Sequence, residues 1–506
     1  MVTFDAAFQL TVGDALRKHA TVQSEKIAIE DATRALSFSE LNQRVNRLAN
    51  LLASKGVRRG DRVAILSENC IPYVELELAA AKLGVIVPCL NWRLAGAELA
   101  HCIKLTAPSM ILVSARHAPS LQQIDHGIGE IVRIDEDYES MLGASPDQEP
   151  HSAVAPEDGL VILYTSGTTG LPKGALISHR AMIARALSFA SEYGITRNDN
   201  YIAWSPLFHM AATDFTLATL MLGGKVLVQD GLDVERLVDI LEREPIGWLM
   251  AIPGMIENLN TELKRRKAQV KSVKMVGAMA DLVPLHQIAE LTTLLRAPYL
   301  NTFGSTETGL APASGSLIPA GQMPQTLAKR ESGFCRIRLV DPDDNDVPDG
   351  APGELIMRGP TLFSGYWGAP DVNADDFRGG WFHMGDMFMR QPDGAINFVD
   401  RVKYLIKSGG ENIYPAEIER VLLSHADVLD AVVVRRRDPK WGEVPVAFVA
   451  CAAPGLTAAA LREWCVGRLA KYKLPSEIRF VAVTDFPRSS TGKIQRHEME
   501  RMWMTP

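Results

Sequence analysis

Hydrophobic and polar positions follow two different periods along residues 11–115. The stretch ELNQRVNRLANLLASKG (residues 40–56) spaces its apolar side chains three and four apart, which predicts an amphipathic helix. RVAILS (62–67) and SMILVS (109–114) are short apolar runs, which predict buried strands. Helices and strands that alternate in this way are typical of an α/β fold.

The middle of the chain repeats this arrangement, because apolar runs that predict strands are separated by stretches compatible with helices. These runs are YIAWSPLFHMA (201–211), GKVLVQDG (224–231), IGWLMAIP (246–253) and VKMVGAMA (273–280). They predict a second α/β layer system, stacked with the first in one large unit. The polar stretch at residues 135–159 is interpreted as a surface connection.

The pattern changes near residue 341. VDPDDNDVPDGAPGELIMRGP (340–360) is rich in Asp, Pro and Gly and has short alternating runs, which predict a small β-rich subdomain. From Lys403 the chain has helix, strand and loop signals of its own, which predict a separate α+β domain of roughly 100 residues. The predicted fold class is therefore α/β, with a large N-terminal domain (residues 1–402) and a small C-terminal domain (403–506).

Size and composition indicate a multidomain globular protein. A chain of 506 residues is too long for a single hydrophobic core. Its 47% hydrophobic and 22% charged residues separate it from disordered and fibrous proteins. The net charge of −7 excludes a chain-wide basic field that would attract nucleic acid or an anionic membrane. A small anionic substrate would therefore need local positive groups.

Cysteine spacing and the N-terminal residues bear on the compartment. The six cysteines form no C-x-x-C pair and show no metal-ligand spacing, which predicts buried free thiols. The start, MVTFDAAFQLTVGD, has no basic region followed by an apolar run, and no stretch reaches the roughly 18 apolar residues that span a bilayer. We therefore expect a cytoplasmic protein without a membrane span and without a nucleic-acid partner.

The first candidate for chemistry is YTSGTTGLPKG (residues 164–174). Its glycines let backbone N–H groups turn toward a ligand, its hydroxyls add donors, and Lys173 adds a compact cation. The buried strand expected before it, GLVILY (159–164), and the helix expected after it (178–194) suggest that the loop joins strand to helix. These features predict a phosphate-binding loop.

Two other structures are compatible with a loop rich in Gly, Ser and Thr. It is not a Walker A element, because Pro172 stands where the pattern G-x-x-x-x-G-K-[ST] requires its second glycine. A flexible surface turn rich in Ser, Gly and Thr is the remaining alternative.

Further stretches combine reactive side chains with special backbone residues. NTFGSTETG (301–309) carries Glu307, and an acid beside phosphate-binding hydroxyls is a candidate Mg²⁺ ligand. Asp386 ends GWFHMGD, where its carboxylate could accept both hydroxyls of a ribose. DRVKYLIKSGGENIYPAEIE (400–419) holds basic residues and a glycine pair, and PRSSTGKIQR presents Lys493. Alone, each has an ordinary interpretation as a turn former, a solvated acid or an exposed cation.

Together and in this order, these stretches resemble the adenylate-forming superfamily of acyl-CoA synthetases, luciferases and peptide-synthetase adenylation domains. The resemblance runs from Leu36 to Arg496, nearly the whole chain. It implies an acid:CoA ligase that uses ATP, Mg²⁺ and coenzyme A. In the first step a carboxylate attacks the α-phosphate of ATP, which releases pyrophosphate and leaves an acyl-adenylate. In the second step a thiol converts the adenylate into a thioester and releases AMP.

The resemblance also implies roles for individual residues in the first step. The β- and γ-phosphates would be bound by the loop residues Thr165, Ser166, Gly167, Thr168, Thr169 and Lys173. Adenine would lie against Phe303, with Gly277 and Ala278 close by. The ribose would be bound by Asp386 and Arg401, Thr306 would touch the α-phosphate, and Glu307 would hold Mg²⁺. Lys493 would bridge carboxylate and α-phosphate oxygens in the transition state, where a fixed cation helps most.

For the second step, the resemblance implies that the C-terminal domain is mobile and pivots at Lys403. Gly409 and Gly410 would line the pantetheine tunnel, because a side chain there would block it. Trp441 and Tyr472 match positions that contact coenzyme A in relatives. Arg93 would contact its phosphates or is a structural arginine.

The residues expected around the acyl group are mostly small and apolar. They are His209, Ala211, Ala212, Met255, Ala278, Met279 and Gly304. This lining predicts a hydrophobic fatty or aromatic acid, and no arginine in these segments could pair with a second carboxylate. His209 is expected to be a gate at the pocket mouth, or else a core histidine. Asp214 leaves an amino-acid substrate as an alternative, because peptide-synthetase adenylation domains hold an α-amino group with an aspartate in this region.

The chain departs from the family pattern at two places. Met384 replaces the usual Thr before Gly385-Asp386, and the stretch RESGFCRIRLVD (330–341) is shorter than the usual glycine-rich entry to the β subdomain. Alternatives to the acid:CoA ligase are an enzyme that loads a carrier protein, a luciferase-like oxygenase and a non-catalytic binding protein. A homodimer is a further possibility.

Overall fold

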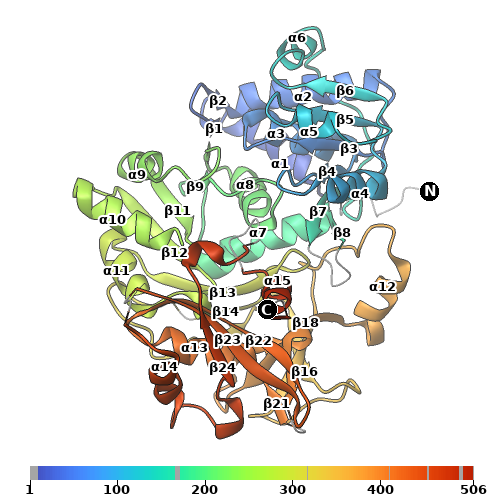
Figure 1. Ribbon diagram of the computed structural model, residues 1–506. Helices are drawn as coiled ribbons and strands as arrows, with labels where there is room; N and C mark the ends of the chain where they lie inside the picture. The colour runs from blue at the N-terminus through green and yellow to red at the C-terminus, as the bar shows by residue number, and fades with distance from the viewer. Residues whose placement is uncertain are drawn as a thin grey trace.

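The computed structural model describes residues 9–165, 171–252, 254–315, 317–408, 411–452, 455–488 and 494–504. Helices and strands alternate through most of these residues, around two large sheets, and a smaller sheet follows near the C-terminus (Figure 1). The predicted α/β class, with a large N-terminal part and a small C-terminal part, is therefore confirmed.

The first sheet has the strand order β6-β5-β3-β4-β7-β8. Its strands are β3 (Val63–Leu66), β4 (Val87–Cys89), β5 (Met110–Val113), β6 (Glu130–Arg133), β7 (Gly159–Thr165) and β8 (Lys173–Ser178). Neighbouring strands are parallel except β7 and β8, which are antiparallel. The helices in this part are α1 (Val12–Val22), α2 (Phe38–Ser54), α3 (Ile71–Leu83), α4 (Gly96–Thr106), α5 (Ala118–Gln122) and α6 (Tyr138–Gly143).

Helix α2 forms where the periodicity predicts it, and its start is set by a capping box. The backbone N–H of Glu40 donates to Ser37 Oγ at 3.2 Å, and the N–H of Ser37 donates to Glu40 Oε2 at 2.8 Å. Two donors at the helix end that would otherwise lack partners are satisfied in this way. The buried face of α2 includes Leu41, Val45, Leu48 and Leu52, which are spaced three or four residues apart.

The second sheet has the order β16-β17-β18-β19-β15-β14-β13-β12-β11-β9-β10-β1-β2. Its strands are β1 (Ile27–Glu30), β2 (Ala35–Ser37), β9 (Asn200–Ala203), β10 (Val226–Val228), β11 (Pro245–Met250), β12 (Ser272–Ala278), β13 (Tyr299–Ser305), β14 (Gly309–Gly315), β15 (Lys329–Glu331), β16 (Arg336–Val340), β17 (Pro352–Arg358), β18 (Phe382–Arg390) and β19 (Ile396–Arg401). The associated helices are α7 (His179–Tyr193), α8 (Met210–Leu222), α9 (Val234–Arg243), α10 (Ile256–Arg266), α11 (Leu285–Leu295) and α12 (Pro370–Asp376), with short 3₁₀ turns η2 (Ala280–Leu282) and η3 (Arg378–Gly380).

One predicted strand in this part is wrong over most of its length. The run 201–211 forms a strand only to Ala203, and α8 begins at Met210. Pro206 lies between the two elements, and proline has no N–H for a strand ladder. This break brings His209 to the N-cap of α8.

The β-rich segment joins the larger sheet. Strands β16 to β19 pair antiparallel with one another, and β19 connects to β15 through the paired positions Lys329 and Ile396. The 3₁₀ turn η4 (Val402–Tyr404) spans the predicted domain boundary, and the boundary itself stays a prediction.

The C-terminal sheet has the order β21-β20-β23-β22, with β24 paired to β23. Its elements are β20 (Ile406–Ser408), β21 (Glu411–Ile413), α13 (Pro415–Leu423), β22 (Val428–Asp438), β23 (Gly442–Cys451), α14 (Ala458–Cys465), η5 (Lys471–Lys473), β24 (Glu477–Phe480), η6 (Val483–Asp485) and α15 (Arg496–Met504). Two clusters of buried apolar side chains consist entirely of residues after 405.

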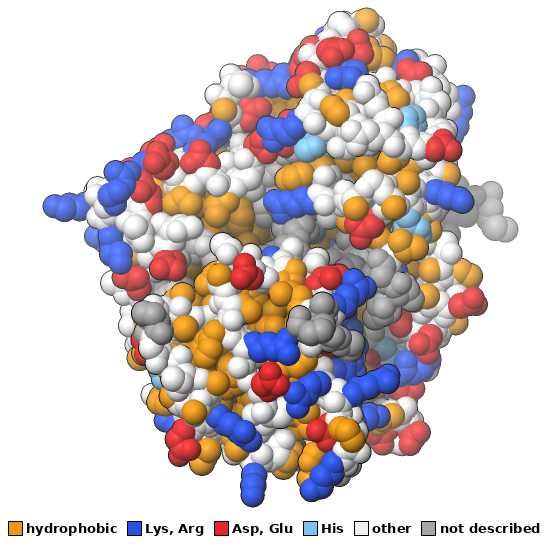
Figure 2. Space-filling model, in the orientation of Figure 1, with side chains coloured by type: hydrophobic (Ala, Val, Ile, Leu, Met, Phe, Trp, Pro, Cys, Tyr) orange, Lys and Arg blue, Asp and Glu red, His pale blue; other side chains and the backbone are white. Residues whose placement is uncertain are grey.

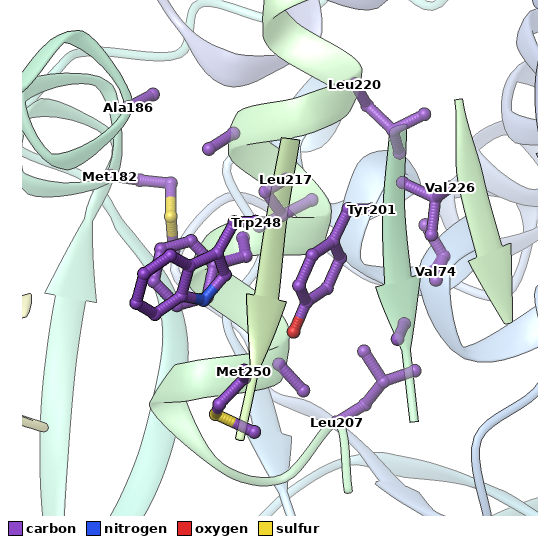
Figure 3. Packing of buried hydrophobic residues seen from close by; sticks show 14 of the residues in the cluster. Val74, Met182, Ala186, Tyr201, Leu207, Leu217, Leu220, Val226, Trp248 and Met250 are labelled. Atoms are coloured by element: carbon purple, nitrogen blue, oxygen red, sulfur yellow. The ribbon is translucent and has the colours of Figure 1, made fainter. Parts of the chain in front are cut away.

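The main core fills the space between the sheets and the helices around them, and α7 and α8 run through it. Figure 3 shows Trp248 of β11 near Met182 of α7, and Tyr201 of β9 near Leu217 of α8. Helix α8 is apolar on nearly all sides and is buried almost throughout. The core therefore fixes the positions of α7 and α8.

The surface carries both signs of charge. On the face shown in Figure 2, Lys and Arg alternate with Asp and Glu instead of gathering in one field. Among the described residues, no helix has the length and apolar composition needed to cross a bilayer. The six cysteines are free, and Cys89, Cys102 and Cys465 are buried while the other three are partly exposed.

His179, at the first turn of α7, gives the fold a pH dependence. Its ring is buried, and the backbone N–H of Val12 donates to Nδ1 at 3.2 Å, so the neutral ring carries its proton on Nε2. Burial lowers the pKa of His179 from 6.5 to about 4, although Asp158 and Asp14 oppose the shift. Protonation would also break the bond to Val12. The unfolded chain therefore binds more protons than the folded chain between these two pKa values.

The contribution of His179 to the free energy of unfolding should be highest above pH 6.5. It should fall by about 3 kcal/mol as the pH decreases to 4. His179→Asn keeps an acceptor near the Nδ1 position but removes the titrating ring, so its unfolding midpoint in urea should depend less on pH over this range. The control is His151→Asn, because His151 is exposed. Its unfolding midpoint should change with pH as steeply as that of the wild type. Equal slopes for all three proteins would contradict the assignment.

Candidate active site

The predicted phosphate loop connects two antiparallel strands. Thr165 at the end of β7 pairs with Lys173 at the start of β8, and α7 begins only after β8, with Ser178 as its N-cap. The expectation that the loop joins strand to helix is therefore wrong, because Lys173–Ser178 form a strand before the helix. Ser166, Gly167, Thr168 and Thr169 lie outside the described residues. Thr165 and Lys173 stand at the base of the loop.

A segment from far along the chain continues this hairpin. The N–H of Leu176 donates to Gly365 O at 3.0 Å, and the N–H of Trp367 donates to Gly174 O at 2.7 Å. The N–H of Phe363 donates to Glu307 O at 2.8 Å. Residues 363–367 therefore hold the phosphate hairpin and the loop of Glu307 together.

The side chains of this segment also meet. Tyr366 donates its hydroxyl to Glu307 Oε1 at 2.8 Å, and Lys173 Nζ lies 4.7 Å from the centre of the Tyr366 ring. Burial, together with the neighbouring Glu307, raises the pKa of Tyr366, so the hydroxyl keeps its proton and remains a donor. Lys173 Nζ is also 4.0 Å from Asp376 Oδ2, and burial raises the pKa of Asp376 although Lys173 opposes the shift. The Lys173 ammonium and the Glu307 carboxylate therefore both lie beside Tyr366, at the same predicted site.

The loop that carries Glu307 is shaped by its own hydroxyls. The N–H of Ser305 donates to Thr308 Oγ1 at 2.9 Å, and the N–H of Glu307 donates to Ser305 Oγ at 3.2 Å. Thr306 O accepts from Arg185 Nη2 at 3.1 Å. Among the described residues, no three His, Cys, Asp or Glu side chains are grouped to hold a metal ion. Glu307 fits a Mg²⁺ site of one carboxylate completed by phosphate oxygens.

Asp386 and Arg401 are brought together by the pairing of β18 with β19, in which they are directly opposite. Arg401 Nε lies 3.1 Å from Asp386 Oδ1, and Asp386 is only 2% exposed. Asp386 raises the pKa of Arg401, with Glu307 contributing to the same shift. The predicted ribose pair therefore lies in the electrostatic field of the predicted Mg²⁺ ligand.

The predicted adenine residues lie on the adjacent strands β12 and β13. Gly277 pairs with Leu300 and Ala278 with Asn301. A Cβ on Gly277 would lie 2.2 Å from Leu300 O, so only glycine permits this approach. Phe303 is buried against Phe388, with ring centroids 4.6 Å apart.

The predicted acyl-pocket residues divide into two groups. His209, Ala211, Ala278, Met279 and Gly304 keep part of their surface exposed, whereas Ala212 and Met255 are buried in the main core. His209 lies at the N-cap of α8, with its ring centroid 4.5 Å from that of Phe208. A Cβ on Gly304 would lie 1.9 Å from Gly309 O, so β13 and β14 can approach only at a glycine.

Asp214 does not have the environment that an amino-acid substrate would need. Its two carboxylate oxygens accept from Arg185 Nη1 at 3.0 and 3.3 Å, and its side chain is 6% exposed. Burial raises the pKa of Asp214, and Arg185 opposes the shift. The carboxylate that would hold an α-amino group is already paired with a cation of the protein, which disfavours that alternative.

The residues expected to act in the second step are spread over the C-terminal part and one N-terminal loop. Lys403 is exposed in η4, and its backbone carbonyl accepts from Arg435 Nη2 at 3.1 Å. Trp441 is 48% exposed in the turn between β22 and β23, and Tyr472 is 44% exposed in η5. The Arg93 guanidinium lies 4.7 Å from the ring centre of Trp92. Gly409 and Gly410 lie outside the described residues, as does Lys493, which is expected to act in the first step.

Comparison with known proteins identifies the family. Residues 16–367 match the family of AMP-binding enzymes, and residues 417–493 match the AMP-binding enzyme C-terminal domain. The chain belongs to the AMP-binding enzyme family. This membership confirms the adenylate-forming superfamily that the motifs predicted. Relatives that are CoA ligases confirm the predicted acyl-CoA synthetase branch.

Relatives of this AMP-binding enzyme cover nearly its whole length. It is 33% identical to the indoleacetate–CoA ligase of Aromatoleum aromaticum, over 96% of both chains. It is 32% identical to a feruloyl-CoA synthase of Amycolatopsis sp, over 96% of this chain and 97% of the relative. The structure of the o-succinylbenzoate coenzyme A synthetase of Bacillus subtilis, in complex with ATP and magnesium ion, superimposes with a TM-score of 0.83. It is 26% identical and covers 96% of this chain and 99% of its own.

Two residues of the AMP-binding enzyme's site were missed in the sequence. Tyr366 and Arg185 contact the Glu307 loop from 59 and 121 residues away. Tyr366 gave only a weak signal, an aromatic beside glycines in SGYWG. Arg185 gave a stronger one, because it stands among Ala181, Met182 and Phe189 on the buried face of α7. A cation at such a position requires a buried partner.

Proposed function

We propose that this protein is an ATP-dependent acid:CoA ligase that forms an acyl-adenylate with release of pyrophosphate, and then an acyl-CoA with release of AMP. The observation that carries the proposal is the cluster of Lys173, Tyr366, Glu307, Asp386 and Arg401. Lys173 and Glu307 are a cation and a carboxylate suited to a metal-bound triphosphate. Asp386 and Arg401 are a polar pair suited to a ribose. Membership of the AMP-binding enzyme family supports this use of the cluster.

In the first step, Lys173 and Thr165 would bind the leaving pyrophosphate together with the rest of the loop. Glu307 would hold Mg²⁺, which neutralises phosphate charge when bound. Tyr366 would orient the carboxylate of Glu307 through its hydrogen bond. Asp386 and Arg401 would fix the ribose, and Thr306 would touch the α-phosphate. Lys493 would then stabilise the charge that spreads over the reacting oxygens. These are interactions that position the reactants and lower the barrier without a covalent enzyme intermediate.

In the second step, the C-terminal domain would pivot at Lys403 and bring Gly409 and Gly410 to the adenylate. Trp441, Tyr472 and Arg93 would bind coenzyme A. The exposure of Trp441 and Tyr472 supports this role, because a large exposed aromatic side chain is available to a ligand. The names of the relatives support coenzyme A as acceptor, with ATP and Mg²⁺ as cosubstrate and metal.

The acid is proposed to be aromatic or fatty. The small and apolar lining at Ala211, Met279 and Gly304 supports it, as do relatives named for indoleacetate and ferulate. A cytoplasmic location and a homodimer remain predictions.

The test is pyrophosphate release by the purified protein with MgATP and a panel of straight-chain, aromatic and amino acids, each with and without coenzyme A. Release that requires an aromatic or fatty acid, with coenzyme A consumed and AMP formed, is expected. Release without consumption of coenzyme A would favour a carrier protein as acceptor. Turnover of malonate equal to that of octanoate or benzoate would contradict the apolar pocket. The absence of release with every acid would overturn the proposal.

A further inference from the structure

Asn69 connects the two large sheets at the carboxyl ends of their strands. It stands three residues after the end of β3, in the first sheet. Its side-chain amide reaches the second sheet at Ala203, the last residue of β9, and at Gln229, the first residue after β10. Ligands of open α/β sheets bind at the carboxyl ends of the strands. Asn69 therefore lies at the edge where a substrate site is expected.

The amide of Asn69 binds the loop between β9 and α8 at every second residue. Its Nδ2 donates to Ala203 O at 3.0 Å and to Ser205 O at 2.7 Å. Its Oδ1 accepts from the N–H of Leu207 at 2.8 Å, and Nδ2 also donates to Gln229 O at 3.1 Å. Asn69 is 8% exposed. Three carbonyls around Nδ2 and one N–H at Oδ1 require an amide, because a carboxylate has no hydrogen to donate.

Local contacts carry this fixed backbone on to His209. The N–H of His209 donates to Pro206 O at 3.0 Å, and Thr213 Oγ1 donates to Leu207 O. The Leu207 side chain belongs to the main core (Figure 3). The ring of Phe208 lies between this core residue and His209 in the chain and contacts the His209 ring. The direction in which His209 leaves the loop therefore depends on the bonds to Asn69.

The loop meets the predicted acyl pocket at His209. Of residues 203–209, all of which the structure describes, Pro206 and His209 keep part of their surface exposed and the others are buried. Buried loop backbone needs hydrogen-bond partners, and Asn69 supplies them at three of these residues. A buried clamp thus sets the place of a side chain that can touch a substrate.

We propose that Asn69 is a positioning residue for the first step: it holds the β9–α8 loop so that His209 stands at the mouth of the acyl pocket and places the acid for attack on ATP. The inference rests on the proposed ligase activity and adds a residue that acts through His209. The predicted ribose pair, Asp386 and Arg401, lies on β18 and β19. Binding of ATP should therefore not depend on Asn69.

The first test compares Asn69→Ala with the wild type in steady-state pyrophosphate release, with the acid of the panel that the wild type uses best. We expect kcat/KM for the acid to fall by about 10²-fold, the cost of a small misplacement by a change away from the chemistry, and KM for ATP to stay within about twofold. Asn46→Ala is the matched control. Asn46 is a buried asparagine whose Nδ2 donates to Asp147 O at 2.9 Å, and it has no assigned role, so both parameters should equal those of the wild type.

A double-mutant cycle separates the positioning of His209 from a general loss of structure. His209→Ala should lower kcat/KM for the acid, and adding Asn69→Ala should then cost less than about threefold, because the side chain through which Asn69 acts is gone. Losses that multiply would mean that Asn69 supports only the fold, which overturns the inference. A wild-type kcat/KM in either single variant would overturn it as well.

A second variant approaches the same loop from α8. Thr213→Val keeps the shape of the side chain and removes the hydroxyl that donates to Leu207 O and to Glu77 Oε1. It serves where Asn69→Ala does not fold, and it should lower kcat/KM for the acid by a smaller factor without changing KM for ATP. An unchanged kcat/KM in Thr213→Val would then count against the inference.

Hydrogen exchange of residues 204–209, followed by mass spectrometry, tests the clamp without any activity. The N–H groups should exchange about tenfold faster or more in Asn69→Ala than in the wild type and in Asn46→Ala. Equal exchange in all three proteins would reject the inference. No pyrophosphate release by the wild type with any acid would instead reject the ligase activity, and the exchange rates would still decide whether Asn69 holds the loop.

Discussion

Glu307→Gln is expected to slow pyrophosphate release by about 10²–10³-fold, the range found when one preorganised group that stabilises transition-state charge is removed. The amide keeps the shape of the side chain and can still accept from Tyr366. It loses the negative charge that would hold Mg²⁺ and that faces Arg401. The measurement is kcat at saturating ATP over a titration of Mg²⁺, and the Mg²⁺ concentration for half-maximal rate should increase as well.

Two neighbouring variants make this result specific. Tyr366→Phe leaves the carboxylate and removes only its hydrogen bond, so the loss should be within about tenfold. Asp376 has no assigned catalytic role, and its carboxylate lies 4.0 Å from Lys173. The effect of Asp376→Asn on the rate should therefore be smaller still. If Glu307→Gln kept the wild-type Mg²⁺ dependence, Glu307 would not be the metal ligand.

The sequence predicted the parts of the site that depend on residue type within a short stretch. The Thr and Ser residues of NTFGSTETG predict hydroxyls that bind phosphate, and this stays a prediction. The structure shows that Ser305 and Thr308 shape the turn after β13 through local hydrogen bonds. The register of β18 and β19, which sets Asp386 against Arg401, could not be read in the same way. It depends on which strands pair, and that is decided by packing between distant segments.

The phosphate hairpin shows why one local prediction failed. The sequence predicted a loop at residues 164–174 that leads to a helix from Ser178, and it did not predict the strand formed by Lys173–Ser178. In the structure it is β8, and its N–H and C=O groups pair with β7 on one side and with residues 364–367 on the other. A strand this short is stabilised by its neighbours and has little pattern of its own.

Arg185→Met is expected to lower the free energy of unfolding by about 3–5 kcal/mol, because it leaves the carboxylate of Asp214 buried without its cation. The same change removes the donors to Thr306 O and Thr361 O, which link α7 to the loop of Glu307 and to the segment after β17. The measurement is the unfolding midpoint in urea. Because burial already raises the pKa of Asp214, the variant should be less unstable at low pH, where that carboxyl can take up a proton.

The double variant Arg185→Met/Asp214→Asn removes both charges of the pair. Comparing its free energy of unfolding with that of Arg185→Met separates the effect of losing the ion pair from the cost of leaving one charge buried without a partner. It should be more stable than Arg185→Met alone, since removing both charges of a buried pair costs less than removing one. A double variant less stable than Arg185→Met would mean that Asp214 has another partner that supports it. In that case Asp214 would again be a candidate for binding a cationic group of the substrate.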